Sequence, residues 1–167
     1  MSCSLPPQTA PAQQIPWKFP RMSRARTYHS PVADETRSTA LRVLVYSDDA
    51  DTRRQVVLAV GPRPHPDLPE LEFLEVATAP TVIERLDAGG IDLAILDGEA
   101  APAGGLGIAK QLKDELTHCP PILVLTGRPD DAWLAKWSRA EAAVAHPIDP
   151  LRLTESVVDL LRKRHAA

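Results

Sequence analysis

Apolar runs alternate with amphipathic stretches along the chain from residue 41 onward. Five short runs, rich in leucine and β-branched residues, indicate buried strands at 41–46, 71–76, 91–96, 121–126 and 142–145. Stretches with helical periodicity follow each of them, at 49–61, 79–90, 104–116, 128–140 and 149–164. This alternation predicts an α/β domain whose five-stranded parallel sheet is covered by helices on both faces and connected by right-handed crossovers.

Residues 1–40 differ in composition from the rest of the chain. They hold six of the 17 prolines, and five Lys or Arg residues against two acidic ones. Such a segment has too little apolar area to fold alone. It nevertheless contains Trp17, Phe19 and Tyr28, three of the seven aromatic residues, which favours a segment that docks on a partner. We therefore predict an extended, basic, proline-rich tail at 1–40 and a folded domain at 41–167.

Charge and composition narrow the classes of function. The chain carries a net charge of −3 and its tail +3, so the domain carries −6. An acidic domain argues against nucleic acid as its main partner. No apolar run approaches the roughly 18 residues that span a bilayer, and the first residues, MSCSLPPQTA, lack the features of a secretion signal. Cys3 and Cys119 have no metal-type spacing and are expected to be free thiols. We expect a cytoplasmic protein that reaches the membrane periphery only through a partner complex.

Polar residues stand where the predicted strands end. Asp97 comes directly after the apolar run LAIL and is followed by Gly98. The other strand ends carry 47–49 (Ser-Asp-Asp), Thr126 and His146. Because ligands of open parallel sheets bind beyond the carboxyl ends of the strands, we expect these side chains to share one rim. An ordinary turn at Asp97 and Gly98 is the alternative.

This pattern resembles the receiver domain of two-component response regulators, a flavodoxin-like (βα)5 fold, over about residues 41–164. The resemblance implies that Asp97 is the phosphoacceptor and that Thr126 is the switch hydroxyl. Pro147 matches the proline of the family's Lys-Pro pair, and the Gly-Leu at 105–106 resembles the start of the helix after the acceptor. In that family the acceptor carboxylate attacks the phosphorus of a phosphohistidine while Mg²⁺ neutralises the developing charge.

The metal-binding positions of the family are only partly retained. Aligned on the first strand, its two acidic positions fall on Ser47 and Asp48. A shift of one residue would make them Asp48 and Asp49, although Asp49 also suits the N-cap of the first helix. The candidate metal ligands are thus Asp48, Asp49 and Asp97. Because hard cations need several oxygen ligands, we expect Mg²⁺ binding to be weak or absent.

Two further positions depart from the family pattern. His146 replaces the lysine that would contact the phosphoryl group together with Thr126. Ala143 stands where the family usually has a switch tyrosine or phenylalanine. An acceptor carboxylate that lacks part of the family's metal-binding and switch residues indicates an atypical receiver, or pseudo-receiver.

These features predict a non-enzymatic receiver that acts as a regulatory or accessory subunit by docking on a larger assembly. Trp133 and Trp137 are four residues apart on one side of the predicted fourth helix, either as an interface anchor or as a buried core stripe. Resemblance to receiver-only proteins suggests the peripheral arm of a respiratory NADH–quinone oxidoreductase. The alternative is a phosphorylation-competent single-domain response regulator that accepts phosphate on Asp97 from a histidine kinase.

Overall fold

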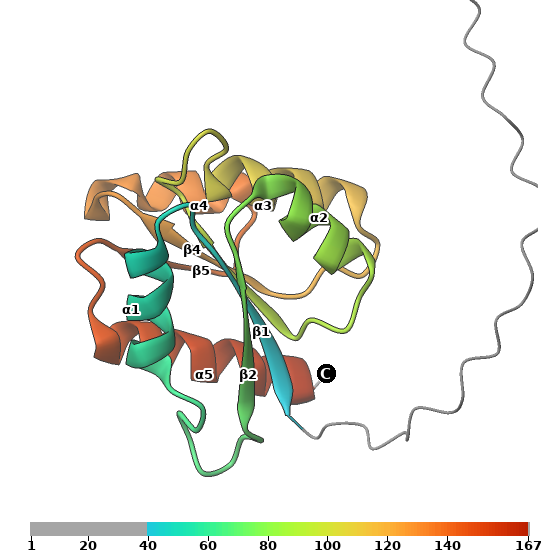
Figure 1. Ribbon diagram of the computed structural model, residues 1–167, viewed down its shortest axis with the longest axis vertical. Helices are drawn as coiled ribbons and strands as arrows, with labels where there is room; N and C mark the ends of the chain where they lie inside the picture. The colour runs from blue at the N-terminus through green and yellow to red at the C-terminus, as the bar shows by residue number, and fades with distance from the viewer. Residues whose placement is uncertain (1–39, 167) are drawn as a thin grey trace, which may run out of the picture. The chain divides into compact units, whose positions relative to one another are not determined.

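The computed structural model describes residues 40–166. The predicted docking residues Trp17, Phe19 and Tyr28 lie outside the described residues. The strands are β1 Leu41–Tyr46, β2 Leu71–Val76, β3 Leu93–Asp97, β4 Ile122–Thr126 and β5 Ala142–Ala145. The helices are α1 Ala50–Val60, α2 Ala79–Asp87, α3 Gly105–Glu115, α4 Ala132–Ser138 and α5 Pro150–Ala166 (Figure 1).

The five strands form one parallel sheet in the order β2-β1-β3-β4-β5, which confirms the predicted fold class. The register aligns the strand ends: Tyr46 of β1 lies beside Leu96 of β3, and Asp97 lies beside Leu125 of β4. Thr126 in turn lies beside Ala145 of β5. The carboxyl ends of β1, β3, β4 and β5 therefore meet at one rim of the sheet.

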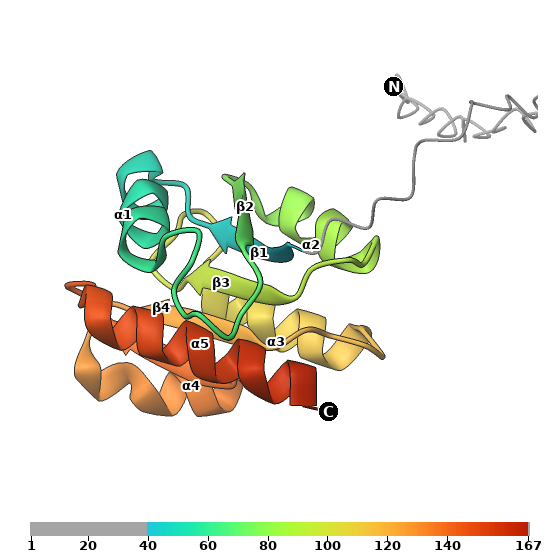
Figure 2. The ribbon, with the colours of Figure 1, turned by 90° about the horizontal axis from the view of Figure 1, so that it is seen from below.

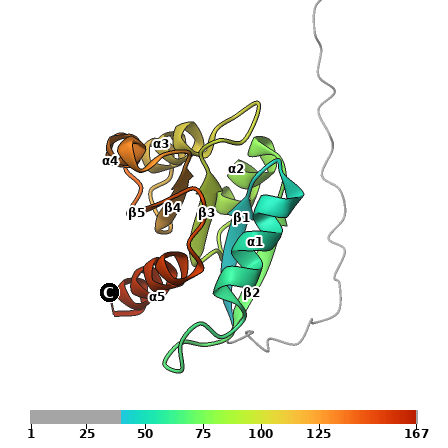
Figure 3. The same cartoon turned by 90° about the vertical axis from the view of Figure 1, so that its left-hand side faces the viewer.

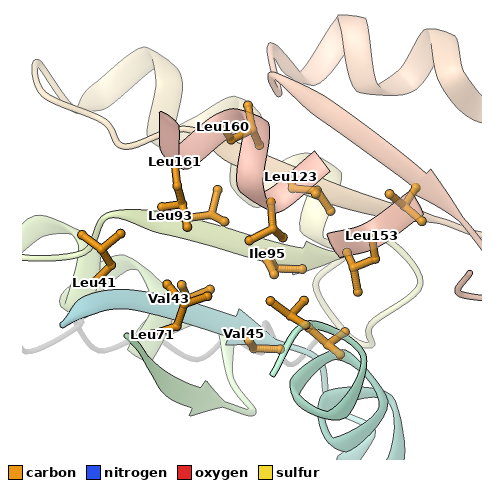
Figure 4. Close-up of a cluster of buried hydrophobic side chains, with 14 of the residues drawn as sticks. Leu41, Val43, Val45, Leu71, Leu93, Ile95, Leu123, Leu153, Leu160 and Leu161 are labelled. Carbon is orange, nitrogen blue, oxygen red and sulfur yellow. The ribbon is translucent and has the colours of Figure 1, made fainter. Parts of the chain in front are cut away.

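Each face of the sheet is covered by helices, as Figures 2 and 3 show. On one face, Val43 and Val45 of β1 pack with residues of α1 and α5 in a cluster drawn in Figure 4. On the other face, Leu44 and Tyr46 of the same strand pack with residues of α2 and α3. The strands were continuous apolar runs in the sequence because alternate side chains are buried on opposite faces.

Two element boundaries differ from the predicted ones. β3 begins at Leu93 rather than residue 91, because its pairing with β1 starts at Val43 and Leu93. The predicted helix at 128–140 is split into a 3₁₀ turn at Pro129–Asp131 and the shorter α4, which ends where Arg139 adopts a left-handed backbone with φ 62°. The remaining bounds agree within three residues.

Candidate functional site

Asp97 is the last residue of β3 and is only 4% exposed. Its Oδ2 accepts a hydrogen bond from the Ser47 hydroxyl at 2.8 Å, and its Oδ1 accepts one from the backbone N–H of Glu99 at 3.0 Å. The next residue, Gly98, continues the pairing by donating its N–H to the Leu125 carbonyl at 2.8 Å. Both oxygens of the candidate acceptor thus have donors within the protein.

Ser47 is completely buried and is held through its side chain and its backbone. Its Oγ accepts the N–H of Asp49 at 3.1 Å while it donates to Asp97. Its carbonyl accepts a hydrogen bond from Arg53 Nη1 at 2.6 Å. Arg53 is itself tied to Glu75 of β2 by an ion pair of 3.3 Å. The turn after β1 is therefore fixed in position relative to β3.

Glycine at the start of α3 lets that helix approach the end of β3. A Cβ on Gly105 would lie 2.6 Å from the Asp97 carbonyl oxygen and 2.8 Å from the Leu96 carbonyl carbon. Real Cβ atoms do not approach backbone that closely. By contrast, a Cβ on Gly107, two residues further along α3, would have nothing within 4 Å. The close packing of α3 against the end of β3, where Asp97 lies, therefore requires glycine at position 105.

Tyr46 was hidden in an apolar strand and was not among the predicted site residues. Its buried hydroxyl donates to the carbonyl of Ala103 at 2.6 Å and so ties β1 to the loop between β3 and α3. Burial raises the pKa of Tyr46, and the negative charges of Asp48 and Asp97 raise it further. The phenol therefore stays protonated and neutral at physiological pH.

Thr126 and His146 reach the same rim from β4 and from the turn after β5. Thr126 is 3% exposed, and its hydroxyl donates to the carbonyl of Arg128 at 3.2 Å. His146 donates its backbone N–H to the carbonyl of Thr126 at 2.8 Å. Its Nε2 lies 3.9 Å from Oδ1 of Asp97, so the imidazole stands next to the candidate acceptor.

Glu99 is a second residue that the sequence analysis did not single out. A Cβ on Gly127, the residue after Thr126, would lie 2.7 Å from Cδ of Glu99. The Glu99 carboxylate therefore extends across to the backbone at the end of β4. Together with Asp97 and Asp48 it makes this rim acidic.

The two remaining candidate metal ligands differ in their surroundings. Asp49 is the N-cap of α1: its Oδ1 accepts the N–H of Asp51 and its Oδ2 accepts the Thr52 hydroxyl, both at 3.0 Å. These hydrogen bonds lower the pKa of Asp49. Asp48 is exposed. Within residues 40–166, no group of three or more His, Cys, Asp or Glu side chains is arranged to hold a metal ion.

The α4 helix presents an aromatic surface. Trp133 and Trp137 are 65% and 52% exposed, whereas the buried residues of this helix are Ala135 and Ser138. The tryptophans are therefore surface residues rather than part of the core.

A groove of about 570 Å³ runs along β5, lined by residues 143–147 and by the first turns of α5.

A five-stranded parallel sheet in this order, with a buried carboxylate at the end of its central strand, defines a receiver domain. The rim adds a hydroxyl at the end of β4 and a His-Pro pair after β5. Solved structures share this fold. The receiver domain of Francisella response regulator 1452 matches 74% of this chain and 98% of its own length, with a TM-score of 0.63 and 14% identity. A CheY-like receiver domain protein from Methanospirillum hungatei matches 76% and 98%, with a TM-score of 0.59 and 19% identity.

No protein-family model matches this chain. Two uncharacterized response regulatory proteins from two strains of Mycobacterium tuberculosis are each 70% identical to it over 125 residues, which is 75% of this chain and 94% of each relative. The chain belongs to the response regulators and carries their receiver domain. Among the helices formed by residues 40–166, none is both long and apolar enough to cross a membrane.

Proposed function

We propose that this protein is an atypical receiver that acts as a non-catalytic regulatory or accessory subunit by docking on a larger protein assembly. The observation that carries the proposal is the exposure of Trp133 and Trp137 on the seven-residue helix α4. Tryptophan is enriched among the residues that dominate the energy of protein interfaces. The tail, with Trp17, Phe19 and Tyr28, would supply a second contact with the partner.

The atypical character rests on the rim. A receiver that switches on phosphorylation needs a cation to neutralise the incoming phosphoryl group and a long, charged side chain to hold it. Here Ser47 stands at one of the acidic positions and His146 stands at the lysine position. Ala143 on β5 offers no aromatic ring that could reorient when Thr126 moves.

The candidate assembly is the peripheral arm of a respiratory NADH–quinone oxidoreductase. The resemblance to receiver-only proteins supports this choice. Docking there would bring the protein to the membrane periphery through its partner.

Replacing both tryptophans of α4 with serine is expected to abolish partner recovery. Truncating a buried interface tryptophan costs about 2–4 kcal/mol, so each change alone should weaken binding by more than about tenfold. The test is affinity purification of the full chain from native membranes and cytosol, followed by subunit analysis and NADH-oxidising activity. Leu58→Ser is the matched control because Leu58 is 75% exposed on α1. The proposal is contradicted if the tryptophan variant recovers as much of the oxidoreductase subunits as Leu58→Ser does. It is also contradicted if the wild type itself recovers none of them.

The alternative is a phosphorylation-competent regulator, and the Asp97 carboxylate at the end of the central strand, with the Thr126 hydroxyl at the end of the neighbouring strand, favours it. Incubation with acetyl phosphate and Mg²⁺, followed by phosphate-affinity electrophoresis, separates the two functions. We expect no band shift for the wild type under conditions that modify a receiver with a complete acidic set. A shift that disappears in Asp97→Asn would establish the alternative.

A further inference from the structure

We propose that the Ser47 hydroxyl holds the Asp97 carboxylate in place of a metal ion and closes this site to divalent cations. The inference deepens the proposed function, on which it rests, because it assigns a cause to the atypical rim. Ser47 directly follows β1, Asp97 ends the neighbouring strand β3, and both residues are buried. Their side chains are joined by a hydrogen bond of 2.8 Å.

The direction of that hydrogen bond is set by the surroundings. A serine hydroxyl has one proton and two acceptor lone pairs. The N–H of Asp49 points at Oγ from 3.1 Å and therefore occupies a lone pair. The Ser47 proton is left to point at Oδ2 of Asp97, where it stabilises the negative charge that a cation would otherwise neutralise.

The other oxygens near this position have partners as well. Oδ1 of Asp97 accepts the Glu99 N–H, Oδ1 of Asp49 caps α1 by accepting the Asp51 N–H, and Oδ2 of Asp49 accepts the Thr52 hydroxyl. Each of these hydrogen bonds takes one lone pair of its oxygen and turns that oxygen toward its donor, so a cation would have to share the oxygens with these donors, with Asp48 as the neighbouring carboxylate. Mg²⁺ requires near-octahedral oxygen coordination and gives up its water reluctantly. The donor set therefore does not fit Mg²⁺.

A carboxylate at position 47 would reverse this situation. The backbone of Ser47 is fixed by Arg53, so an aspartate side chain there would start from the same point beside Asp97. Two carboxylates in contact repel each other, and a divalent cation relieves the repulsion. The variant Ser47→Asp is thus expected to gain a metal site. In the absence of metal it should be less stable than the wild type.

The experiment measures thermal unfolding of the full chain in EDTA and in excess MgCl2. The wild type should unfold at the same temperature in both. Ser47→Asp should unfold at a lower temperature in EDTA and recover by about 5 °C or more with Mg²⁺, because binding to the folded state alone raises the midpoint. Ser47→Asn, of matching size but neutral, should show no recovery, nor should Ser47→Asp combined with Asp97→Asn.

A second measurement keeps the proposal testable if Ser47→Asp does not fold. Titration of the wild type with Mn²⁺, followed by the electron paramagnetic resonance signal of the free ion, should show no stoichiometric loss of signal. Stoichiometric Mn²⁺ binding by the wild type, or equal Mg²⁺ responses of the wild type and a folded Ser47→Asp, overturns the proposal. These readouts do not involve α4, so they are independent of whether the docking proposal holds.

Discussion

Replacement of Asp97 with alanine is expected to lower the free energy of unfolding by about 2–4 kcal/mol. The change leaves the Ser47 hydroxyl and the Glu99 N–H without the charged acceptor that they share. Ser47 is fully buried, so little water is available to replace that acceptor. Urea unfolding followed by circular dichroism at neutral pH measures the loss. Asp97→Asn keeps one acceptor oxygen and should fall between the alanine variant and the wild type.

The sign of this effect distinguishes the hydrogen-bonded rim from an ordinary cluster of acids. In a cluster of unpaired carboxylates, neutralising one of them relieves repulsion and stabilises the fold. The matched control is Asp48→Ala, since Asp48 is exposed at the same rim and should change stability by less than about 0.5 kcal/mol. A stability gain for Asp97→Ala would contradict the network around Ser47.

Replacement of Gly105 with alanine is expected to cost about 2 kcal/mol or more. The added methyl group would meet the backbone of Leu96 and Asp97 at distances of 2.6–2.8 Å. Backbone cannot move aside as the end of a flexible side chain can, so α3 must shift away from β3. Chemical denaturation measures the loss, and amide chemical shifts of Gly98 and Glu99 should report displacement of the rim.

Gly107→Ala is the control on the same helix. Its Cβ would meet nothing within 4 Å, so only helix propensity acts there, and the variant should gain about 0.5–1 kcal/mol. Propensity alone predicts a gain at both positions. Opposite signs at Gly105 and Gly107 would therefore show that close approach to β3 dominates. Equal gains would show that α3 does not need Gly105 in order to pack.

The fold could be predicted from the sequence because the strands are almost purely apolar. LAIL and ILVL have no polar face, which indicates burial on both sides and hence a sheet between two helical layers. The boundary error in the fourth helix has a local cause. Pro129 and the acidic residues that follow it form a 3₁₀ turn, and a left-handed residue at Arg139 ends the helix early.

The candidate site was predictable in its location more than in its bonding. Parallel strands bring Asp97, Thr126 and His146 to one rim whatever their rotamers. The sequence does not show that Ser47 is a donor to Asp97, because that depends on the orientation of one hydroxyl. The role of Tyr46 could not be predicted for a similar reason. Its apolar ring fits the strand pattern, and its hydroxyl donates a hydrogen bond to the carbonyl of Ala103, far away in the sequence.

The tryptophans of α4 illustrate what spacing leaves open. Residues four apart share one side of a helix, but the spacing does not say which side faces the sheet. In α4 the small residues Ala135 and Ser138 are buried, and Trp133 and Trp137 face outward. The small side chains of Ala135 and Ser138 therefore form the buried side of this short helix.

The methyl side chain of Ala143 in β5 has a consequence for any partner that binds along this edge. A methyl group has no alternative rotamer, so this position cannot alternate between an inward and an outward state. A ligand shifts a conformational equilibrium only when the two states differ in affinity for it. A partner bound along β5 therefore could not be controlled through a rotamer change at position 143.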